Sequence, residues 1–157
     1  MEFFYYLLPR NFYTNILNYK MVNQVNKKFL KSSHFISNLK LCEIRMIDNS
    51  KFPWIILIPK RKKISDISEL NKKDRSLLMD EIVYCSNLMK KIFKTSKLNV
   101  EKIGNIVPQL HIHIIARKKT DITWPLSVWV TKSKPYTKKN LRFVINKISE
   151  GFSKKKR

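Results

Sequence analysis

Four short apolar runs along the chain predict β-strands. Residues 41–47 (LCEIRMI) alternate in part between apolar and polar, and residues 53–59 (PWIILIP) form a continuous apolar run between two prolines. The second run is β-branched and too short for a stable helix, so we expect a strand buried on both faces. Residues 98–104 alternate again, and residues 110–117 (LHIHIIAR) follow as the fourth predicted strand. Asp, Asn and Ser at 48–50 mark a turn between the first two, because these side chains bond to their own backbone.

A long helix is predicted over residues 71–94, where apolar side chains recur at steps of three and four. Asn71 is a suitable N-cap, and Asp74 stands three residues further on as the partner of a capping box. The apolar stripe is expected to pack in the core, which makes the thiol of Cys85 inert. Its members are Leu77, Leu78, Ile82, Cys85, Leu88, Met89, Ile92 and Phe93.

A second helix is predicted over residues 136–151, with Thr137 as its cap and Gly151 just past its end. Residues 22–38 are polar and ambiguous, and they predict at most a short helix across 24–30. A chain of 157 residues is expected to form one domain, or one domain plus tails, and no internal repeats are visible.

The chain carries a formal net charge of +22 and has a pI of about 10.2. Such a surface attracts polyanions such as nucleic acid, nucleotides or anionic lipid. The same charge is typical of a lysine-rich proteome whose proteins have solvated basic surfaces, and the sequence leaves both interpretations open. The densest basic run, residues 153–157, is expected to be a disordered tail.

Cysteine usage and hydropathy indicate a cytoplasmic protein. Cys42 and Cys85 are the only cysteines, and they form neither a CxxC pair nor a disulfide framework. No apolar run approaches the roughly 20 residues of a membrane helix, so no membrane association is expected. The aromatic N-terminus lacks a basic n-region and a cleavage site, which argues against a secretory signal. Residues 1–20 precede Met21. They are interpreted either as the product of a start codon assigned too far upstream or as a short extension.

The stretch 104–117 concentrates the rarest residues of the chain. It contains one of the two glycines and two of the three histidines. Gly104 and Asn105 predict a tight connection, because glycine reaches positive φ without steric cost and asparagine tolerates it.

Side chains alternate faces along the strand that follows this connection. Gln109, His111 and His113 therefore share one face. The residues between and after them share the other face and can enter the core; they are Leu110, Ile112 and Ile114. The strand is thus expected to be fixed by one face and to present two imidazoles on the other.

Two histidines at this spacing admit several interpretations. One interpretation is a pair of structural histidines whose hydrogen bonds are made within the fold. The others are zinc ligands, a general acid or base that titrates near neutral pH, and a nucleophile with a partner that orients it. Zinc requires a third ligand, and His34, the remaining histidine, has no metal-ligand spacing to the pair. No metal is therefore expected, and the residues alone do not choose among the others.

The stretch VPQLHIHIIAR resembles the motif of the histidine triad (HIT) superfamily, in which three histidines alternate with hydrophobic residues. Gln109 stands in place of the first histidine. The resemblance continues through LCEIRMIDNSKFPWIILIPKR, the long helix, LNVEKIGNIVPQ and TWP, in the family's order, and covers roughly residues 39–129. Within the superfamily, the chain is similar to a bacterial branch that carries NxVPQLHxHxIAR and a downstream WP…W.

The resemblance implies a fold and an assembly. HIT proteins are α+β domains with an antiparallel sheet of about five strands and helices on it, and they usually pair as homodimers. The predicted long helix and C-terminal helix fit this plan. Residues 39–130 then form the HIT domain, residues 1–38 an N-terminal extension, and residues 131–157 a C-terminal helix with a basic tail.

The resemblance also implies a reaction. HIT proteins bind nucleotides and cleave them at the α-phosphate, and the middle histidine forms a covalent nucleotidyl intermediate. That position is His111 here. His113, at the third position, is expected to bond phosphate oxygens or the leaving group, and Gln109, at the first, to bond the imidazole network through its amide. No metal or cofactor is required.

Other positions match the family's binding residues. Asp48 stands where an acid often contacts the ribose hydroxyls, and Asn99 and Asn105 match polar positions on the phosphate side. Backbone N–H groups of the turn at Gly104 and Asn105 are suited to stabilise charge on the phosphate.

Two functions follow from these residues. One is a nucleotide hydrolase or transferase that acts on a dinucleoside polyphosphate or a nucleoside phosphoramidate. The other is a non-catalytic HIT scaffold that holds nucleotide or nucleic acid, which the charge and Gln109 favour. Ile106 replaces a small hydroxyl residue found near the leaving group in many members, so leaving-group preference is open. Trp124 and Trp129 are expected either to close on a partner subunit or to pack on the surface.

Overall fold

A computed structural model describes residues 25–153. The expectations for residues 1–20 and for most of the basic tail lie outside this range. The elements, in chain order, are α2 (Lys27–Ser32), β1 (Ser33–Asn38), β2 (Cys42–Ile47), β3 (Trp54–Pro59), the 3-10 turn η1 (Ile67–Glu69), α3 (Lys72–Phe93), β4 (Lys97–Glu101), β5 (Ile112–Arg117), the 3-10 turn η2 (Val128–Val130) and α4 (Lys138–Ser153).

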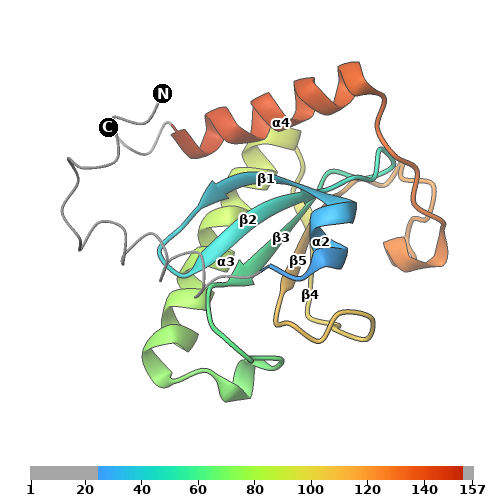
Figure 1. Ribbon diagram of the computed structural model, residues 1–157. Helices are drawn as coiled ribbons and strands as arrows, with labels where there is room; N and C mark the ends of the chain where they lie inside the picture. Colours follow the sequence, from blue (N-terminus) through green and yellow to red (C-terminus); the bar gives the residue numbers. More distant parts are fainter. Residues whose placement is uncertain (1–24, 154–157) are drawn as a thin grey trace, which may run out of the picture.

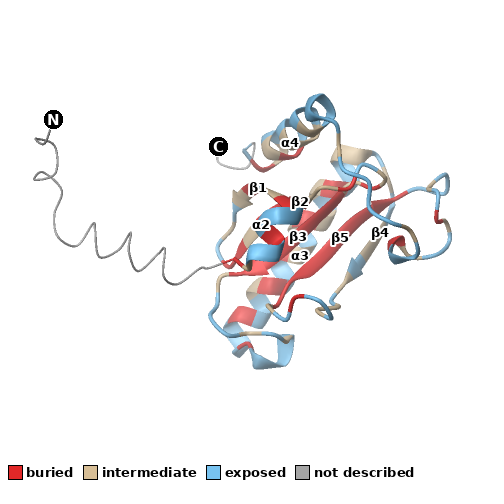
Figure 2. Cartoon of the chain, turned by 45° about the vertical axis from the view of Figure 1, so that its right-hand side comes forward, coloured by how far each residue is buried: buried red, intermediate tan, exposed pale blue. Residues whose placement is uncertain are grey.

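The strands form one antiparallel sheet in the order β1-β2-β3-β5-β4 (Figure 1). The predicted α+β fold with about five strands is therefore confirmed. Figure 2 shows the central strands β3 and β5 buried along their length, whereas the edge strands β1 and β4 are buried only in part. A continuous apolar run such as that of β3 is typical of a strand covered on both faces.

The strand β1 is the element that the sequence pattern missed. Its sequence SHFISN is largely polar, and in the described part of the chain it pairs only with β2, at the edge of the sheet. Ile36 is its contribution to the main core, and the pairing shifts register between Phe35 and Ser37. An edge strand with one core residue and an irregular register carries little of the alternation that reveals strands.

The main core lies between the sheet and the helices α3 and α4. Asn71 caps α3 as predicted, because its side chain accepts from the Asp74 N–H at 2.9 Å. Buried Glu81 fastens the middle of α3 to β2 by accepting the N–H groups of Leu41 and Cys42 at 2.6 and 2.8 Å. Burial, followed by the Glu81 carboxylate, raises the pKa of the Cys42 thiol well above its usual range.

The second predicted helix is present as α4, and Thr137 accepts from the Asn140 N–H at 3.3 Å. The interpretation of Gly151 as a residue past the helix end is wrong, because Gly151 lies inside α4. A Cβ atom there would lie 2.8 Å from Ile92 Cδ1 and 2.9 Å from Leu88 Cδ1. Gly151 therefore permits the close approach of α4 to α3.

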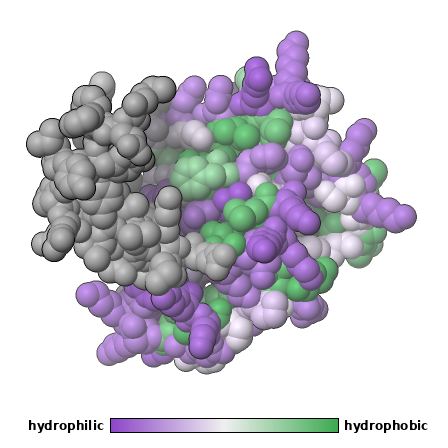
Figure 3. All heavy atoms as spheres, viewed as in Figure 1, coloured by the Kyte–Doolittle hydropathy of each residue, from purple (hydrophilic) through white to green (hydrophobic). Residues whose placement is uncertain are grey.

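The opposite face of the sheet carries α2 and a second, smaller core that includes Phe29, Trp54, Ile115 and Val128. In Figure 3, which shows this face, hydrophilic side chains predominate around hydrophobic patches. Among the described residues, no helix is long and apolar enough to cross a membrane.

Candidate functional site

The side chains of His111 and His113 lie next to each other on the face of the sheet that carries α2. Their ring centroids are 4.7 Å apart with an interplanar angle of 79°, and both residues are buried, with 5% and 4% of their surface exposed. The residues that alternate with them enter the main core, as predicted; they are Leu110, Ile112 and Ile114. The packing of one strand face thus fixes the position of the two imidazoles.

His111 is held in a single tautomer by the main chain. Its Nδ1 lies 2.7 Å from the carbonyl oxygen of Gln109. Because a carbonyl only accepts, Nδ1 carries the proton and Nε2 keeps a free lone pair. Burial lowers the pKa of His111; the bond to the Gln109 carbonyl opposes this shift and the charge of Lys102 adds to it. The ring of Phe29 on α2 packs edge-on at 4.6 Å and covers the imidazole.

His113 is held in the opposite tautomer. The indole N–H of Trp54 donates to His113 Nδ1 at 3.0 Å, so the ring proton of the neutral imidazole lies on Nε2. Burial, followed by the neighbouring His111, lowers the pKa of His113 to about 3. One imidazole therefore offers an acceptor at Nε2 and the other a donor.

Trp129 completes the wall around His113. Its ring packs edge-on against Trp54 at 4.9 Å and His113 at 5.2 Å, and its indole N–H donates to Glu101 Oε2 at 2.5 Å. The sequence left this tryptophan between a subunit contact and surface packing, and the structure places it beside the histidines of its own chain. The downstream WP…W pattern includes this tryptophan, but the pattern does not show that the fold brings η2 to the histidines.

A cavity of ≈ 860 Å³ opens over the two histidines. Gly104 and Asn105 line it, and Gly104 adopts φ +79°, as the predicted tight connection requires. Lys28 and Lys31 on α2 bring two positive charges to its wall, and the remaining wall is largely apolar. Its further lining includes Phe29, Ile47, Ile103, Ile106, Val107 and Val128.

Asp48 also lines this cavity, and its carboxylate is partly engaged. Oδ1 accepts from the Tyr136 N–H at 2.8 Å, and Oδ2 lies 3.7 Å from His34 Nε2. The segment that leads into α4 is fastened here as well, because Ser50 N–H donates to the Lys134 carbonyl at 2.6 Å. Asp48 therefore joins the end of β2 to the far side of the cavity.

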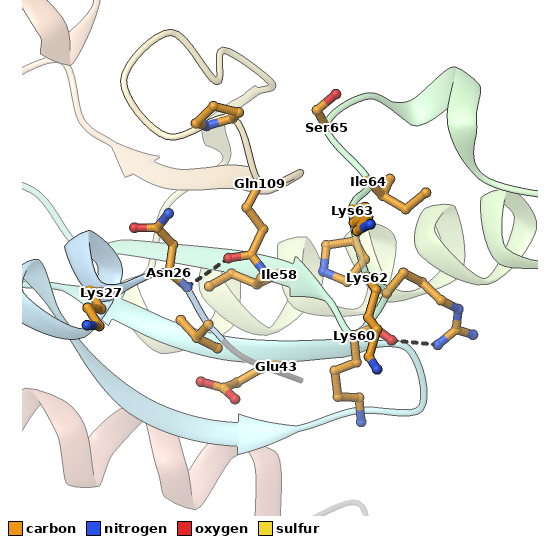
Figure 4. A pocket seen from close by; sticks show the side chains of 14 residues that line it. Asn26, Lys27, Glu43, Ile58, Lys60, Lys62, Lys63, Ile64, Ser65 and Gln109 are labelled. Atoms are coloured by element: carbon orange, nitrogen blue, oxygen red, sulfur yellow. Dashed lines mark hydrogen bonds between the residues drawn. The ribbon is translucent and has the colours of Figure 1, made fainter. Parts of the chain in front are cut away.

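Two of the expected site residues lie away from the histidine cavity. Gln109 Oε1 accepts from the Asn26 N–H at 2.9 Å, and its side chain lines a second cavity (Figure 4). Asn99, on β4, accepts from Arg117 Nη1 at 2.6 Å and is not among the residues that line the histidine cavity. The bond between Gln109 and His111 runs through the main-chain carbonyl, whereas the side-chain amide was expected to make it.

Arg117 organises the loop that carries Trp129, a role that sequence reasoning missed. The residue is 1% exposed, and its side chain donates to Asp121 at 2.8 Å and to the Leu126 carbonyl at 3.0 Å, besides Asn99. Its charge is compensated within the loop. An arginine that ends a buried strand is the only sequence signal for this role.

Within residues 25–153, no group of three or more His, Cys, Asp or Glu residues is placed to hold a metal ion. The chemistry available at the site is that of two neutral imidazoles, one carboxylate and nearby lysines.

Comparisons with known proteins agree with this geometry. The HIT domain family model matches residues 28–120, more than half of the chain. A histidine triad protein from Sinorhizobium meliloti 1021 is 32% identical, with 83% of this chain and 98% of that chain covered and a TM-score of 0.79. A histidine triad protein from Marinobacter aquaeolei VT8 is 30% identical, with coverages of 85% and 98% and a TM-score of 0.81.

A more distant solved structure shares the fold. The diadenosine triphosphate hydrolase of Plasmodium falciparum, in complex with cyclomarin A, is 20% identical, with coverages of 91% and 97% and a TM-score of 0.55. No curated protein sequence matches this chain significantly. The family model and the two bacterial relatives agree with the paired histidines, of which His113 lies on β5 and His111 directly before it. The chain therefore belongs to the histidine triad (HIT) family.

Proposed function

We propose that this protein is a nucleotide hydrolase or transferase that cleaves at the α-phosphate of a dinucleoside polyphosphate or a nucleoside phosphoramidate. The observation that carries the proposal is the pair of opposite tautomers. Nε2 of His111 has a free lone pair and His113 presents an Nε2–H donor beside it. A nucleophile and a donor to the departing charge are the two groups that this reaction needs.

In the first step, Nε2 of His111 attacks the α-phosphorus and a P–N bond forms. The bond from phosphorus to the leaving group breaks, its electron pair goes to the leaving group, and the Nε2–H of His113 donates a hydrogen bond to the charge that develops. Positive charge then builds up on the imidazole of His111, and the Gln109 carbonyl at Nδ1–H stabilises it. Water next attacks the same phosphorus, the P–N bond breaks with its electron pair returning to Nε2, and the nucleoside monophosphate leaves while the proton lost by the water passes to solvent.

Burial supports this role for His111. Only unprotonated imidazole is nucleophilic, and burial lowers the pKa of His111, which keeps the ring neutral near pH 7. The cavity also offers a place for a nucleotide, with apolar walls for the base, Asp48 for the ribose hydroxyls, and Lys28 and Lys31 for phosphate charge.

The relatives support the substrate class. The solved structures at 30% and 32% identity are named histidine triad proteins, and a more distant one is named a diadenosine triphosphate hydrolase. The bacterial source of the first two, together with the stretch from Asn105 to Arg117, supports placing this chain in the bacterial branch that carries NxVPQLHxHxIAR.

The test is release of AMP from diadenosine tetraphosphate and from an adenosine phosphoramidate. Wild type should release AMP, and His111→Ala should lower the rate by at least about a thousandfold, as expected when a nucleophile is removed. A quenched reaction should also yield a protein mass raised by one adenylyl group, that is AMP less one water, attached at His111. Equal AMP release by wild type and His111→Ala would exclude catalysis by this residue.

A non-catalytic scaffold is the second candidate, and the net charge of +22 favours it. In that case nucleotide or nucleic acid should bind without turnover, the affinity should fall steeply with added salt, and binding should survive His111→Ala.

We also propose a cytoplasmic homodimer. β4 is an edge strand whose partner side is open among the described residues, and exposed apolar side chains lie on it, in the connection after it and in the segment after β5. They are Val100, Ile106, Ile122, Leu126, Trp129 and Val130. Both cysteines are free and buried, as a reducing compartment permits. Light scattering should give twice the chain mass, and Val100→Lys should shift it toward the monomer.

A further inference from the structure

A second cavity of ≈ 690 Å³ lies beside the histidine site. The loop after β3 forms one side, the start of α2 the other, and Gln109 lies between them (Figure 4). Among the residues that the structure describes, none lines both this cavity and the histidine cavity. It is therefore a separate site, and the proposed reaction does not use it.

The charge around this second cavity is strongly unbalanced. Within residues 25–153, five cationic residues line it against one carboxylate, that of Glu43. Glu43 is paired with Arg45 at 2.7 Å. The cations are Lys27, Lys60, Arg61, Lys62 and Lys63.

Within residues 25–153, three of the cations have neither an ion pair nor a side-chain hydrogen bond. Arg61 is neutralised by a two-point contact with Asp74 at 2.7 Å, and Lys60 donates to a main-chain carbonyl. Lys27, Lys62 and Lys63 form no ion pair within residues 25–153. Like charges around one concavity repel each other, and a bound anion relieves that repulsion.

The loop that carries these lysines is built into the fold. Lys63 adopts φ +54°, a conformation that residues other than glycine rarely take and that often marks functional turns. The next residue, Ile64, accepts from the Leu110 N–H at 2.8 Å. Across the cavity, the Gln109 side chain is fixed by the Asn26 N–H. The walls are therefore anchored to the strand segment that precedes His111.

We propose that this cavity binds a short phosphate chain, either inorganic polyphosphate or the polyphosphate of a nucleotide. Lysine ammonium groups are compact point charges with several donors, which suits phosphate oxygens. The volume falls within the range of small-molecule sites, and Ile58, Ile64 and Pro108 give the cavity an apolar part. Nucleic acid is typically bound along an extended basic stripe, whereas these cations surround one concavity.

The test is calorimetric titration of the full chain with inorganic tripolyphosphate. Lys62→Gln with Lys63→Gly removes two cavity charges, and glycine accepts the positive φ at position 63. Lys138→Gln with Lys139→Gln removes the same charge from exposed positions on α4 and serves as the matched control. The cavity variant should bind about tenfold more weakly, and the control should stay within about twofold of wild type.

An equal loss of tripolyphosphate affinity in both variants would overturn the proposal, because attraction by the net charge would explain that loss. No loss in either variant would also overturn it, because tripolyphosphate would then bind elsewhere. Binding that survives His111→Ala separates this site from the histidine site, so the proposal stands or falls independently of the hydrolase function.

Repeating the titration with ATP decides whether the site takes inorganic polyphosphate or the polyphosphate of a nucleotide. If the cavity variant weakens ATP as much as tripolyphosphate, the site takes nucleotide polyphosphates. If it weakens tripolyphosphate alone, the site takes the inorganic chain. A single-stranded oligonucleotide that loses affinity in the cavity variant while tripolyphosphate does not would assign the surface to nucleic acid and refute the proposal.

Discussion

The indole Nε1 of Trp54 lies 3.0 Å from Nδ1 of His113 and donates its proton to it. Register places Trp54 opposite Ile115 in the β3–β5 pairing, so its side chain lies on the same face as His113, two residues along the strand. The bond joins two buried groups, so the folded structure itself fixes the tautomer of His113.

Trp54→Phe should allow His113 to adopt either neutral tautomer, because it removes the indole N–H and keeps an aromatic ring in place. The ¹⁵N shifts of His113 should change from a pure Nε2–H pattern to a mixture, and AMP release should fall about 10- to 100-fold through kcat. Trp129→Phe is the matched control, because it removes an indole N–H that bonds Glu101 and leaves the bond to His113 intact. Unchanged His113 shifts in Trp54→Phe would refute the assigned role.

Acidification should destabilise the protein through His113. Its pKa is about 3 in the fold and near 6.5 in the unfolded chain, so the unfolded state binds more protons between these values. The stabilising contribution is fully present above about pH 6.5 and is lost as the pH falls toward 3. In His113→Gln, the slope of unfolding free energy against pH in this window should decrease by up to about 1.4 kcal/mol per pH unit. Urea unfolding at several pH values measures both slopes, and parallel slopes would show that His113 is not involved.

Gly151→Val should destabilise the protein by about 1 to 3 kcal/mol, because the new side chain must displace Ile92 and Leu88 of α3. The neighbouring exposed position supplies the control. Glu150→Val introduces the same β-branched residue into the same helix and should cost less than about 1 kcal/mol. Thermal or urea unfolding gives both values, and equal losses would mean that helix propensity, and not the contact between α4 and α3, sets the cost.

Arg117→Lys should destabilise the protein by about 2 to 4 kcal/mol although the charge is kept. A lysine ammonium cannot reach Asn99, Asp121 and the Leu126 carbonyl together, so buried acceptors lose their donors. The fluorescence of Trp129 should respond as its loop loosens. Lys118→Arg, the opposite exchange at the exposed next residue, should leave unfolding and fluorescence close to wild type.

The elements with regular patterns were predictable from sequence. The apolar run of β3, the stripe and cap of α3, and the alternation around His111 and His113 all follow from local periodicity, and the structure places them as expected. These features depend on residues close together in the chain.

The features that were missed depend on distant partners. The side chain of Gln109 is placed by the Asn26 N–H, 83 positions away, and Asp48 is engaged by Tyr136, 88 positions away. Gly151 is required by its contact with Leu88 and Ile92 on α3, which is a different helix. No local pattern encodes such contacts, because they exist only once the sheet and helices have assembled.

The acceptor that fixes the tautomer of His111 is a main-chain carbonyl, and every amino acid supplies one. Position 109 can therefore change its side chain without changing the protonation of the imidazole two residues later. In this chain, glutamine in place of the motif's first histidine leaves that acceptor where it is, because the path of the main chain sets its position. A sequence search that requires three intact histidines would therefore pass over chains such as this one, in which the main chain supplies that acceptor.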